Sequence, residues 1–419
     1  MITADTAIDP AQTETQFLGL APYLRMSIAG VDMRPLGQET LEQAGRNPAD
    51  AELWMNLSII LQCFGQRDIG LSIQSLALEH KRIFRLAASQ QPAKLRLLML
   101  CVAGDIAANT PLDCLLENSD IDLIFCYVSS DAPLPGAIPE HDAVFVAISE
   151  SDENRSVLTA LEHALMHWSK PVINSPQYIP STGREAASRL LQGATGLLIP
   201  PTLHASRSVL QSIAAGDTRL SAQFADCDFP IIVRPVGSHA GKNLDRIERP
   251  EELADYLSKV ADAEFFLSRF IDYSGKDGLF RKFRVVLIDG KAYACHMGVS
   301  SNWMIHYVNA GMYDDAQKRA EEAAFMEHFG DFAERHRAAL DAIYRRTRLD
   351  YLCIDCAETQ DGRFFVFEID HTMVVHAMDP VHLFPYKQPH MQKIKDAFRD
   401  FLLRLTTEQT HANEPAQQP

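Results

Sequence analysis

The strongest constraint on the fold is an alternation of short apolar runs with helical segments that begins near residue 95. Apolar runs of strand length cover 95–103, 121–128 and 142–148, and a helical pattern follows at about 154–168. Strands that alternate with helices are typical of a parallel sheet whose strands are joined by crossover helices. Such a sheet often binds a nucleotide or a substrate at the carboxyl ends of its strands. The sequence therefore predicts an α/β fold, although its first loop has one glycine and no dinucleotide fingerprint.

A helical section precedes this predicted sheet. Asn47 and Pro48 suit the start of a helix, because Asn caps helices and Pro fits the first helical position. Apolar residues then recur at helical spacing, and a second amphipathic stretch runs from Ile69 to Ile83. The pair resembles one tetratricopeptide unit. Since arrays of such units need about three repeats for stability, the pair indicates a packing appendage rather than a peptide-binding groove.

Three carboxylates are predicted to meet on the last β-hairpin. Asp361-Gly362 lies in the turn between two apolar runs, so Asp355 should lie directly across from Glu368, with Asp370 two residues further on the same face. Carboxylates on one face repel each other, so either they point into water or a cation lies among them. Because the flanking residues are strongly apolar, the pattern favours a magnesium site over a merely acidic surface.

A glycine-containing loop, VGSHAGK (236–242), follows a predicted strand over 229–235. Backbone N–H groups of such a loop can bind phosphate, and Lys242 could add positive charge. The loop is not a Walker motif, because it is one residue too short and Asn243 replaces the required Ser or Thr. An ordinary turn is the alternative.

The segment 296–313 contains many side chains that can orient a substrate. A two-residue turn at Asp289-Gly290 pairs His296 with Phe283, on the face opposite Arg284, unless a bulge intervenes. Histidines here are candidates for proton transfer near neutral pH, and a loop held by aromatic packing is the alternative. The sequence leaves open which histidines are catalytic: His296, His306, His371 or His376.

These motifs occur in a recognisable order. They are, along the chain, a strand that ends in Arg234-Pro235, a Ser-x-x-Gly loop, the strand FFLSRFI and a terminal carboxylate hairpin. This order resembles the ATP-grasp superfamily, particularly its glutathione-synthetase-like branch with the glutamate ligases that modify ribosomal protein S6. The resemblance covers roughly residues 95–405. It implies a two-lobed ATP-grasp fold, α/β with α+β C-terminal lobes, preceded by a Rossmann-like parallel-sheet domain and a small helical region.

The expected division of the chain has five parts. They are a helical tetratricopeptide-like region (1–93), a Rossmann-like substrate domain (94–176), a small lobe with the glycine loop (177–271), a large lobe with the metal site (272–405) and a disordered tail (406–419).

The resemblance also implies which residues bind ATP and Mg²⁺. The expected nucleotide contacts are phosphate-binding Arg207 and Arg234, the mobile loop Ser238, His239, Ala240, Gly241 and Lys242, and an adenine-binding hinge of Phe266, Leu267 and Ser268. The expected metal ligands are Asp355, Glu368 and Asp370, the last standing where the family commonly has Asn. The expected catalytic residues are Arg284, which faces the transferred phosphate, Lys282 on the same face of its strand, and His296.

Charge and composition exclude other classes of protein. The 419 residues include 39 basic and 55 acidic side chains, for a net charge of −16. This balance gives no basic field to attract nucleic acid or anionic lipid. The N-terminus has no basic residue ahead of an apolar core, and the apolar runs fall short of the roughly 20 residues of a membrane helix. We expect a cytoplasmic protein without nucleic-acid or membrane partners.

The implied activity is that of an ATP- and magnesium-dependent ligase. It would phosphorylate a carboxylate and let an amine displace the phosphate, which forms an amide or peptide-like bond. The substrates would be small-molecule or peptide carboxylates and amines, whose identity the sequence does not give; it also leaves the oligomeric state open, a homo-oligomer included. Two alternatives are a phosphotransferase on the same scaffold and a non-catalytic nucleotide-binding or interaction protein.

Overall fold

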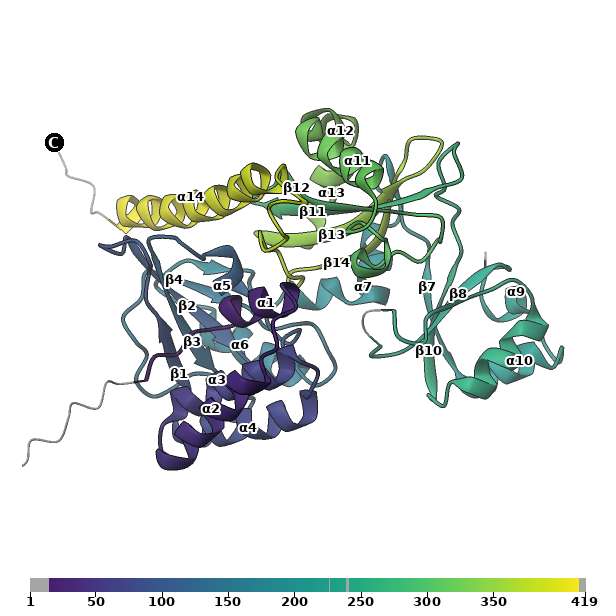
Figure 1. The fold of residues 1–419 in the computed structure, drawn as a ribbon. Coiled ribbons are helices and arrows are strands. Elements are labelled where there is room, and N and C mark those ends of the chain that lie inside the picture. Colours follow the sequence, from purple (N-terminus) through teal and green to yellow (C-terminus); the bar gives the residue numbers. More distant parts are fainter. Residues whose placement is uncertain (1–14, 226, 239–240, 414–419) are drawn as a thin grey trace, which may run out of the picture.

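A computed structural model describes residues 15–225, 227–238 and 241–413 (Figure 1). Three sheets and their covering helices make up this part of the chain, which confirms the predicted mixed α/β class. We refer to them in chain order as the first, second and third sheet.

Four helices precede the first sheet: α1 (Ala21–Ile28), α2 (Arg34–Arg46), α3 (Ala51–Cys63) and α4 (Arg67–His80). The pair α3 and α4 matches the predicted helical hairpin. Asp50, rather than the expected Asn47, caps α3, because its carboxylate accepts a hydrogen bond of 3.1 Å from the backbone N–H of Leu53. The amphipathic pattern that extended to Ile83 ends earlier, since Ile83 begins a strand.

The first sheet has the strand order β1-β3-β2-β4-β5. Its elements are β1 (Ile83–Leu86), β2 (Leu95–Cys101), α5 (Leu112–Leu115), β3 (Ile121–Tyr127), β4 (Ala143–Val146), α6 (Arg155–Leu165) and β5 (Val172–Ile173). The pairs β3–β2, β2–β4 and β4–β5 are parallel, as predicted, whereas the edge strand β1 is antiparallel to β3. Residues on both faces of the central strands are buried, as expected for a sheet covered on two sides.

The second sheet is antiparallel, with the order β7-β10-β8-β9. Its elements, and those that lead into it, are η1 (Ile179–Thr182), α7 (Arg184–Leu191), β6 (Leu197–Leu198), β7 (Thr202–Ser206), α8 (Arg207–Ala214), α9 (Leu220–Gln223), β8 (Ile231–Pro235), β9 (Asp245–Ile247), α10 (Pro250–Lys259) and β10 (Glu264–Arg269). It has a hydrophobic core of its own, formed with α8 and α10. Strands β6 and β7 lie between helices α7 and α8.

The third sheet has the order β12-β11-β13-β14-β6. Its strands, and the helices that follow them, are β11 (Phe280–Ile288), β12 (Lys291–Ser300), η2 (Tyr307–Asn309), α11 (Ala316–Glu327), α12 (Phe329–Arg335), α13 (Arg337–Thr347), β13 (Tyr351–Glu358), β14 (Phe364–Asp370) and α14 (Lys387–Asn413). Both predicted hairpins are present. Residues 406–413, expected to be disordered, continue helix α14, because extending an existing helix carries no new nucleation cost.

The third sheet lies between the other two in space (Figure 1). The first sheet with the N-terminal helices is on one side, and the second sheet with α9 and α10 is on the other. Asn174, directly after β5, joins the first sheet to the third. Its side-chain amide donates to the backbone oxygen of Tyr351 at 2.9 Å and accepts from the Tyr351 N–H at 3.0 Å.

Replacing Asn174 with alanine is expected to lower the free energy of unfolding by about 2–3 kcal/mol, because two buried backbone groups of Tyr351 lose a partner. Asn174 is fully buried and has a φ of 54°. Asn118→Ala is a matched control, since Asn118 is exposed and has a φ of 62°. Urea unfolding of the two variants separates the lost hydrogen bonds from backbone strain. Equal losses in both variants would contradict this role for the Asn174 side chain.

Candidate active site

The carboxylates of the last hairpin lie where three strands of the third sheet run side by side. Asp355 on β13 pairs with Glu368 on β14, as predicted, and with Arg284 on β11. Asp370 pairs with Cys353, so all three carboxylates share one face of the sheet, as the hairpin pattern predicts.

Asp355 is enclosed by cations of the protein itself. Its carboxylate accepts hydrogen bonds from Nε of Arg284 at 2.8 Å and from the second guanidinium nitrogen, Nη2, at 3.1 Å. Nζ of Lys282 lies 2.7 Å from the same carboxylate, and the Asp355 side chain is 1% exposed. Burial alone would raise the pKa of Asp355, but Arg284 and Lys282 hold it well below its ordinary value. The Asp355 carboxylate is therefore ionised, and the positive charges of Arg284 and Lys282 compensate its negative charge.

Glu368 has a cationic partner from a distant part of the chain. Arg184, the first residue of α7, forms an ion pair with the Glu368 carboxylate. Burial opposes ionisation of Glu368, while Arg184, Lys282 and Arg234 lower its pKa and Asp355 raises it. Arg184 was not among the predicted site residues, because its partner is 184 positions away and no local motif marks it.

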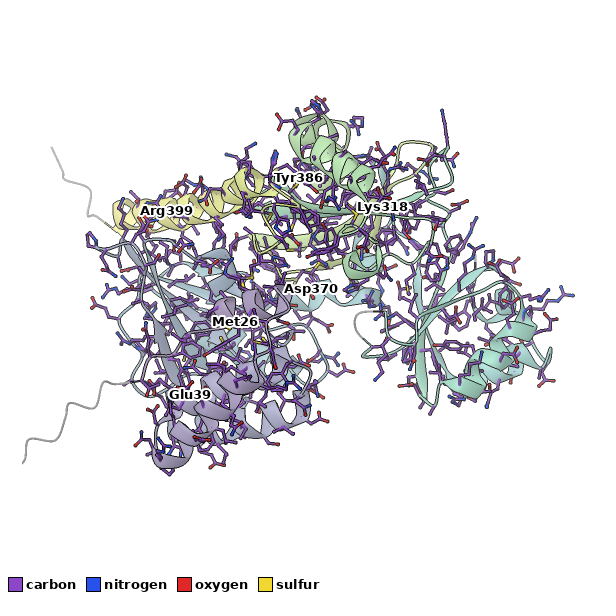
Figure 2. The ribbon with its side chains drawn as sticks, in the orientation of Figure 1. Met26, Glu39, Lys318, Asp370, Tyr386 and Arg399 are labelled. Carbon is purple, nitrogen blue, oxygen red and sulfur yellow. The ribbon has the colours of Figure 1, made fainter. Side chains whose placement is uncertain are left out.

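Asp370 has other partners than Asp355 and Glu368 have. Its carboxylate accepts hydrogen bonds from the backbone N–H of Thr372 at 2.9 Å and from the Thr372 hydroxyl at 2.8 Å. It lies at the end of β14, where the third sheet approaches the first (Figure 2). The adjacent His371 is buried, and its Nε2 hydrogen bonds to the backbone oxygen of Ile148 at 3.0 Å.

The three carboxylates, as the structure places them, do not fit a magnesium ion. Within residues 15–225, 227–238 and 241–413, no group of three His, Cys, Asp or Glu side chains is arranged to hold a metal. The physical reason lies in the ion pairs. Both oxygens of Asp355 contact Lys282 or Arg284, and one oxygen of Glu368, Oε2, contacts Arg184.

Arg234, on a strand of the second sheet, is a further charged residue of the site. It ends β8 and is 7% exposed. Burial and the nearby charge of Arg184 lower its pKa to about 10, while Glu368 opposes that shift. Its Nε donates to the hydroxyl of Ser238 at 3.2 Å, and a terminal nitrogen donates to the Ser238 carbonyl. We call Arg184, Arg234, Lys282 and Arg284 the basic cluster.

The glycine loop begins at the basic cluster. Ser238 contacts Arg234, and its own hydroxyl donates to the carbonyl of Pro235 at 2.9 Å. His239 and Ala240 lie outside the described residues. Gly241 has a φ of +72°, where a side chain would be strained, and Lys242 is exposed. The predicted loop thus starts beside the predicted phosphate-binding arginine.

Arg207, predicted to bind phosphate, contacts backbone carbonyl groups. Its guanidinium donates to the backbone oxygens of Asp262 at 2.9 Å, Leu257 at 3.0 Å and Val260. These carbonyls lie at and beyond the C-terminal end of α10, where helix carbonyls lack intrahelical partners. Arg207 therefore contacts that helix end, and its binding of phosphate stays a prediction.

The predicted adenine hinge, residues 266–268, belongs to a central strand of the second sheet. These residues lie inside β10, which pairs with β7 on one edge and β8 on the other. A strand with neighbours on both edges uses its backbone N–H and C=O groups in the two ladders. The backbone of Phe266, Leu267 and Ser268 is therefore engaged in the pairing with β7 and β8, and their contact with adenine stays a prediction.

The predicted strand pairing of His296 is wrong. The sequence paired it with Phe283, but a β-bulge between Arg284 and Val285 shifts the register, and His296 pairs with Arg284. The two side chains thus share a face. The His296 ring lies 4.7 Å from the ring of Tyr307. Burial, followed by the charges of Arg284 and Lys387, lowers the pKa of His296 well below its ordinary value.

The pKa of His306 is also lowered, by burial and then by the charges of Lys282 and Arg284, so both histidines are neutral near pH 7. A neutral imidazole can accept a proton or donate its ring N–H. This segment therefore lies within the field of the basic cluster.

Stability should fall as the pH drops below about 6.5, because an unfolded histidine takes up a proton there and the folded His296 does not. The contribution of His296 is fully present above that pH and is lost on acidification. His296→Gln should reduce the decrease in melting temperature between pH 7.5 and pH 5.5. His163→Gln, at an exposed position of α6, is the control and should leave the decrease unchanged. An unaltered decrease in the His296 variant would contradict the assignment.

A buried charged network supports the segment that carries these histidines. Glu322 on α11 accepts hydrogen bonds from the Met297 N–H at 3.0 Å, the Tyr307 hydroxyl at 3.0 Å and the Tyr386 hydroxyl at 2.6 Å. Lys387, at the start of α14, lies 3.3 Å from Glu322 and 2.9 Å from Asp379. Tyr386 is labelled in Figure 2. Sequence reasoning missed this network, because its members come from separate helices and loops and no shared motif marks them.

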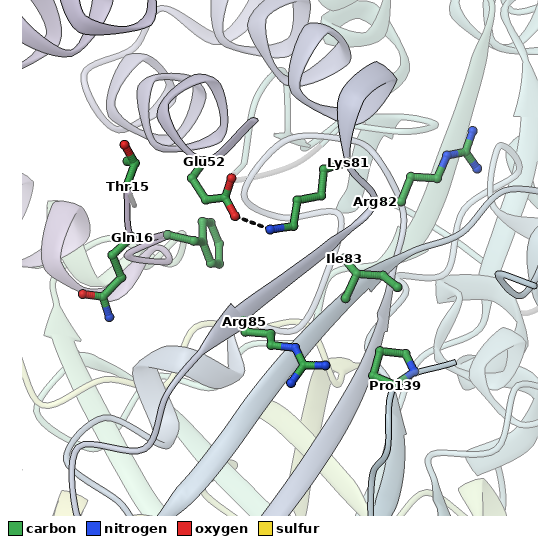
Figure 3. A pocket seen from close by; sticks show the side chains of 9 residues that line it. Thr15, Gln16, Glu52, Lys81, Arg82, Ile83, Arg85 and Pro139 are labelled. Carbon is green, nitrogen blue, oxygen red and sulfur yellow. Dashed lines mark hydrogen bonds and ion pairs between the residues drawn. The ribbon is translucent and has the colours of Figure 1, made fainter. Parts of the chain in front are cut away.

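A cavity of about 640 Å³ lies elsewhere, between the N-terminal helices and the edge strand β1 (Figure 3). Its lining includes Lys81, Arg82 and Arg85, and Lys81 forms an ion pair with Glu52 across it. No residue of the basic cluster lines this cavity.

Comparison with known proteins gives structural matches only. No protein-family model matches the chain, and no curated protein sequence matches it. D-alanine–D-alanine ligase from Bacillus anthracis, solved as a complex with ATP, is 13% identical with a TM-score of 0.47, covering 75% of this chain and 99% of the ligase. The VanG D-Ala:D-Ser ligase from Enterococcus faecalis is 13% identical with a TM-score of 0.45, covering 73% and 99%.

A third similar structure is a RimK domain ATP-grasp protein from Sphaerobacter thermophilus. It is 14% identical, with a TM-score of 0.41, and the match covers 74% of this chain and 99% of that protein. In the described part of the chain, no helix has the length and apolar character needed to cross a membrane.

Proposed function

We propose that this protein is an ATP-dependent ligase that joins a carboxylate to an amine through an acyl phosphate. The observation that carries the proposal is the basic cluster. Lys282 and Arg284 from the third sheet contact Asp355, Arg184 from α7 contacts Glu368, and Arg234 from the second sheet interacts electrostatically with Glu368. Four cations against two anions leave excess positive charge at one place in a protein whose net charge is −16.

Excess positive charge suits phosphoryl transfer. Negative charge develops on the leaving diphosphate as the terminal phosphoryl group is transferred, and fixed cations stabilise that charge without reorganising. Arginine offers a planar fork that matches phosphate oxygens, and lysine offers a compact charge. Arg234 is buried and contacts Ser238 at the start of the glycine loop, and a bound phosphate there would offset the repulsion between Arg234 and Arg184.

The order of motifs along the chain supports a ligase rather than an unrelated anion-binding protein. The strand that ends at Arg234, the loop that starts at Ser238 and the hairpin that carries Asp355 and Glu368 meet at the basic cluster. These are the elements on which the resemblance to ATP-grasp ligases rests. The neutral His296 and His306 beside the cluster are candidates to accept the proton of the attacking amine.

The test is to incubate the protein with ATP, divalent metal ions and pooled amino acids, peptides and organic acids, and to analyse the products by mass spectrometry. A ligase releases ADP and phosphate together with a product one water lighter than its two substrates. Arg234→Met should lose this turnover, and Arg249→Met, at an exposed arginine of the same lobe, should keep it. A stable phosphorylated product would instead indicate a phosphotransferase, and ATP binding without turnover a non-catalytic protein.

A further inference from the structure

We propose that Lys282 and Arg284 supply the positive charge between Asp355 and the bound phosphates, so that the site binds a nucleoside triphosphate without a divalent cation. The inference rests on the proposed function, since it concerns how the same site takes up its nucleotide. It follows from the disagreement between the predicted magnesium ligands and the contacts that these carboxylates make.

The first step of the argument is the geometry at Asp355. The carboxylate is almost fully buried and has charged hydrogen-bond donors on both oxygens, at 2.8 Å from Arg284 and 2.7 Å from Lys282. A divalent ion could bind Asp355 only by displacing at least one of these cations. The displaced cation would then be left partly buried without its partner, which is costly.

The second step is the position of Lys282. It lies two residues before Arg284 on β11, so both side chains extend from one face of the strand. An ammonium group has three donors, and its contact with one carboxylate leaves capacity for phosphate oxygens. The charge of Lys282 also lowers the pKa of Glu368 and the pKa of His306.

The third step is the balance of charge. Asp355 neutralises one positive charge of the basic cluster, and Glu368 neutralises another. Two of the four positive charges of the cluster therefore remain without a negative partner in it. Because burial and Arg184 already disfavour the charged form of Arg234, an incoming anion relieves that repulsion. A metal-free triphosphate brings more negative charge than its magnesium complex, and this site can compensate it.

Calorimetric titration of the full chain with ATP, once in EDTA and once in excess magnesium, tests the inference. The wild-type dissociation constants should agree within about threefold. Lys282→Met should weaken binding in EDTA by about tenfold or more, because a charged contact to phosphate is lost, and magnesium should restore part of the affinity. Lys291→Met, at the exposed turn of the same hairpin, removes equal charge and should bind as the wild type does.

Lys282→Arg keeps the positive charge and should keep the affinity for metal-free ATP. This variant distinguishes a loss of charge from a loss of the fold. A melting curve of each variant verifies that it is folded. Wild-type affinity that falls by more than about tenfold in EDTA would overturn the inference and leave the proposed function standing. Equal metal-free affinity of Lys282→Met and Lys291→Met would also overturn it. Absence of ATP binding in both buffers would overturn the inference and the proposed function together.

Discussion

Replacing Asp355 with asparagine is expected to lower the free energy of unfolding by about 3–5 kcal/mol, because two cations are left without their carboxylate in the interior of the third sheet. Asp355 is 1% exposed, and the side chains of Lys282 and Arg284 are 21% and 19% exposed. Asparagine keeps the shape of the side chain, so the change isolates the charge. Urea unfolding measures the loss.

Asp361→Asn is the control for this variant. Asp361 lies in the turn of the same hairpin, is 56% exposed and forms an ion pair with Arg363. Exposed pairs contribute about 0–1 kcal/mol, so this variant should remain close to the wild type. A loss of less than about 1 kcal/mol in Asp355→Asn would mean that water or movement of Lys282 and Arg284 compensates the missing charge.

Replacing Glu322 with alanine is expected to have an effect of similar size, about 3–5 kcal/mol. Glu322 is fully buried and accepts hydrogen bonds from Met297, Tyr307 and Tyr386. Its removal leaves Lys387 with Asp379 as the remaining carboxylate partner described for it. The loss should appear in urea unfolding and should also release the segment that carries His296 and His306.

Glu327→Ala is the matched control, because Glu327 ends the same helix and its side chain is 72% exposed. Hydrogen exchange at the backbone N–H of Met297 provides a local readout. Exchange should accelerate in Glu322→Ala and remain slow in Glu327→Ala. Unchanged exchange in the Glu322 variant would show that the network does not hold this strand.

The sequence was sufficient for features that depend on local chemistry. Asp-Gly turns set the two hairpins and placed Asp355 across from Glu368, because the turn length fixes which residues face each other. The alternation of strands and helices gave the parallel core of the first sheet. The bulge beside Arg284 could not be predicted, since no local signal marks an extra residue in a strand of ordinary composition, and it reversed the predicted face of His296.

Features that depend on distant partners were not predictable. The carboxylate pattern predicted a magnesium ion, and it could not show that Lys282 and Arg284 contact Asp355, because that contact depends on the pairing of β11 with β13. Arg184 reaches Glu368 from a helix that has no motif. Arg207 has the charge expected of a phosphate ligand, yet three backbone carbonyls around the end of α10 occupy it.

The central claim is that the basic cluster binds the phosphates of a nucleotide. A crystal structure of the protein with a non-hydrolysable ATP analogue tests it most directly. We predict that oxygens of the triphosphate lie within hydrogen-bond distance of Arg234 and Lys282, next to the loop that starts at Ser238. A nucleotide bound elsewhere, for example in the cavity beside β1, with the cluster free of phosphate, would contradict the account.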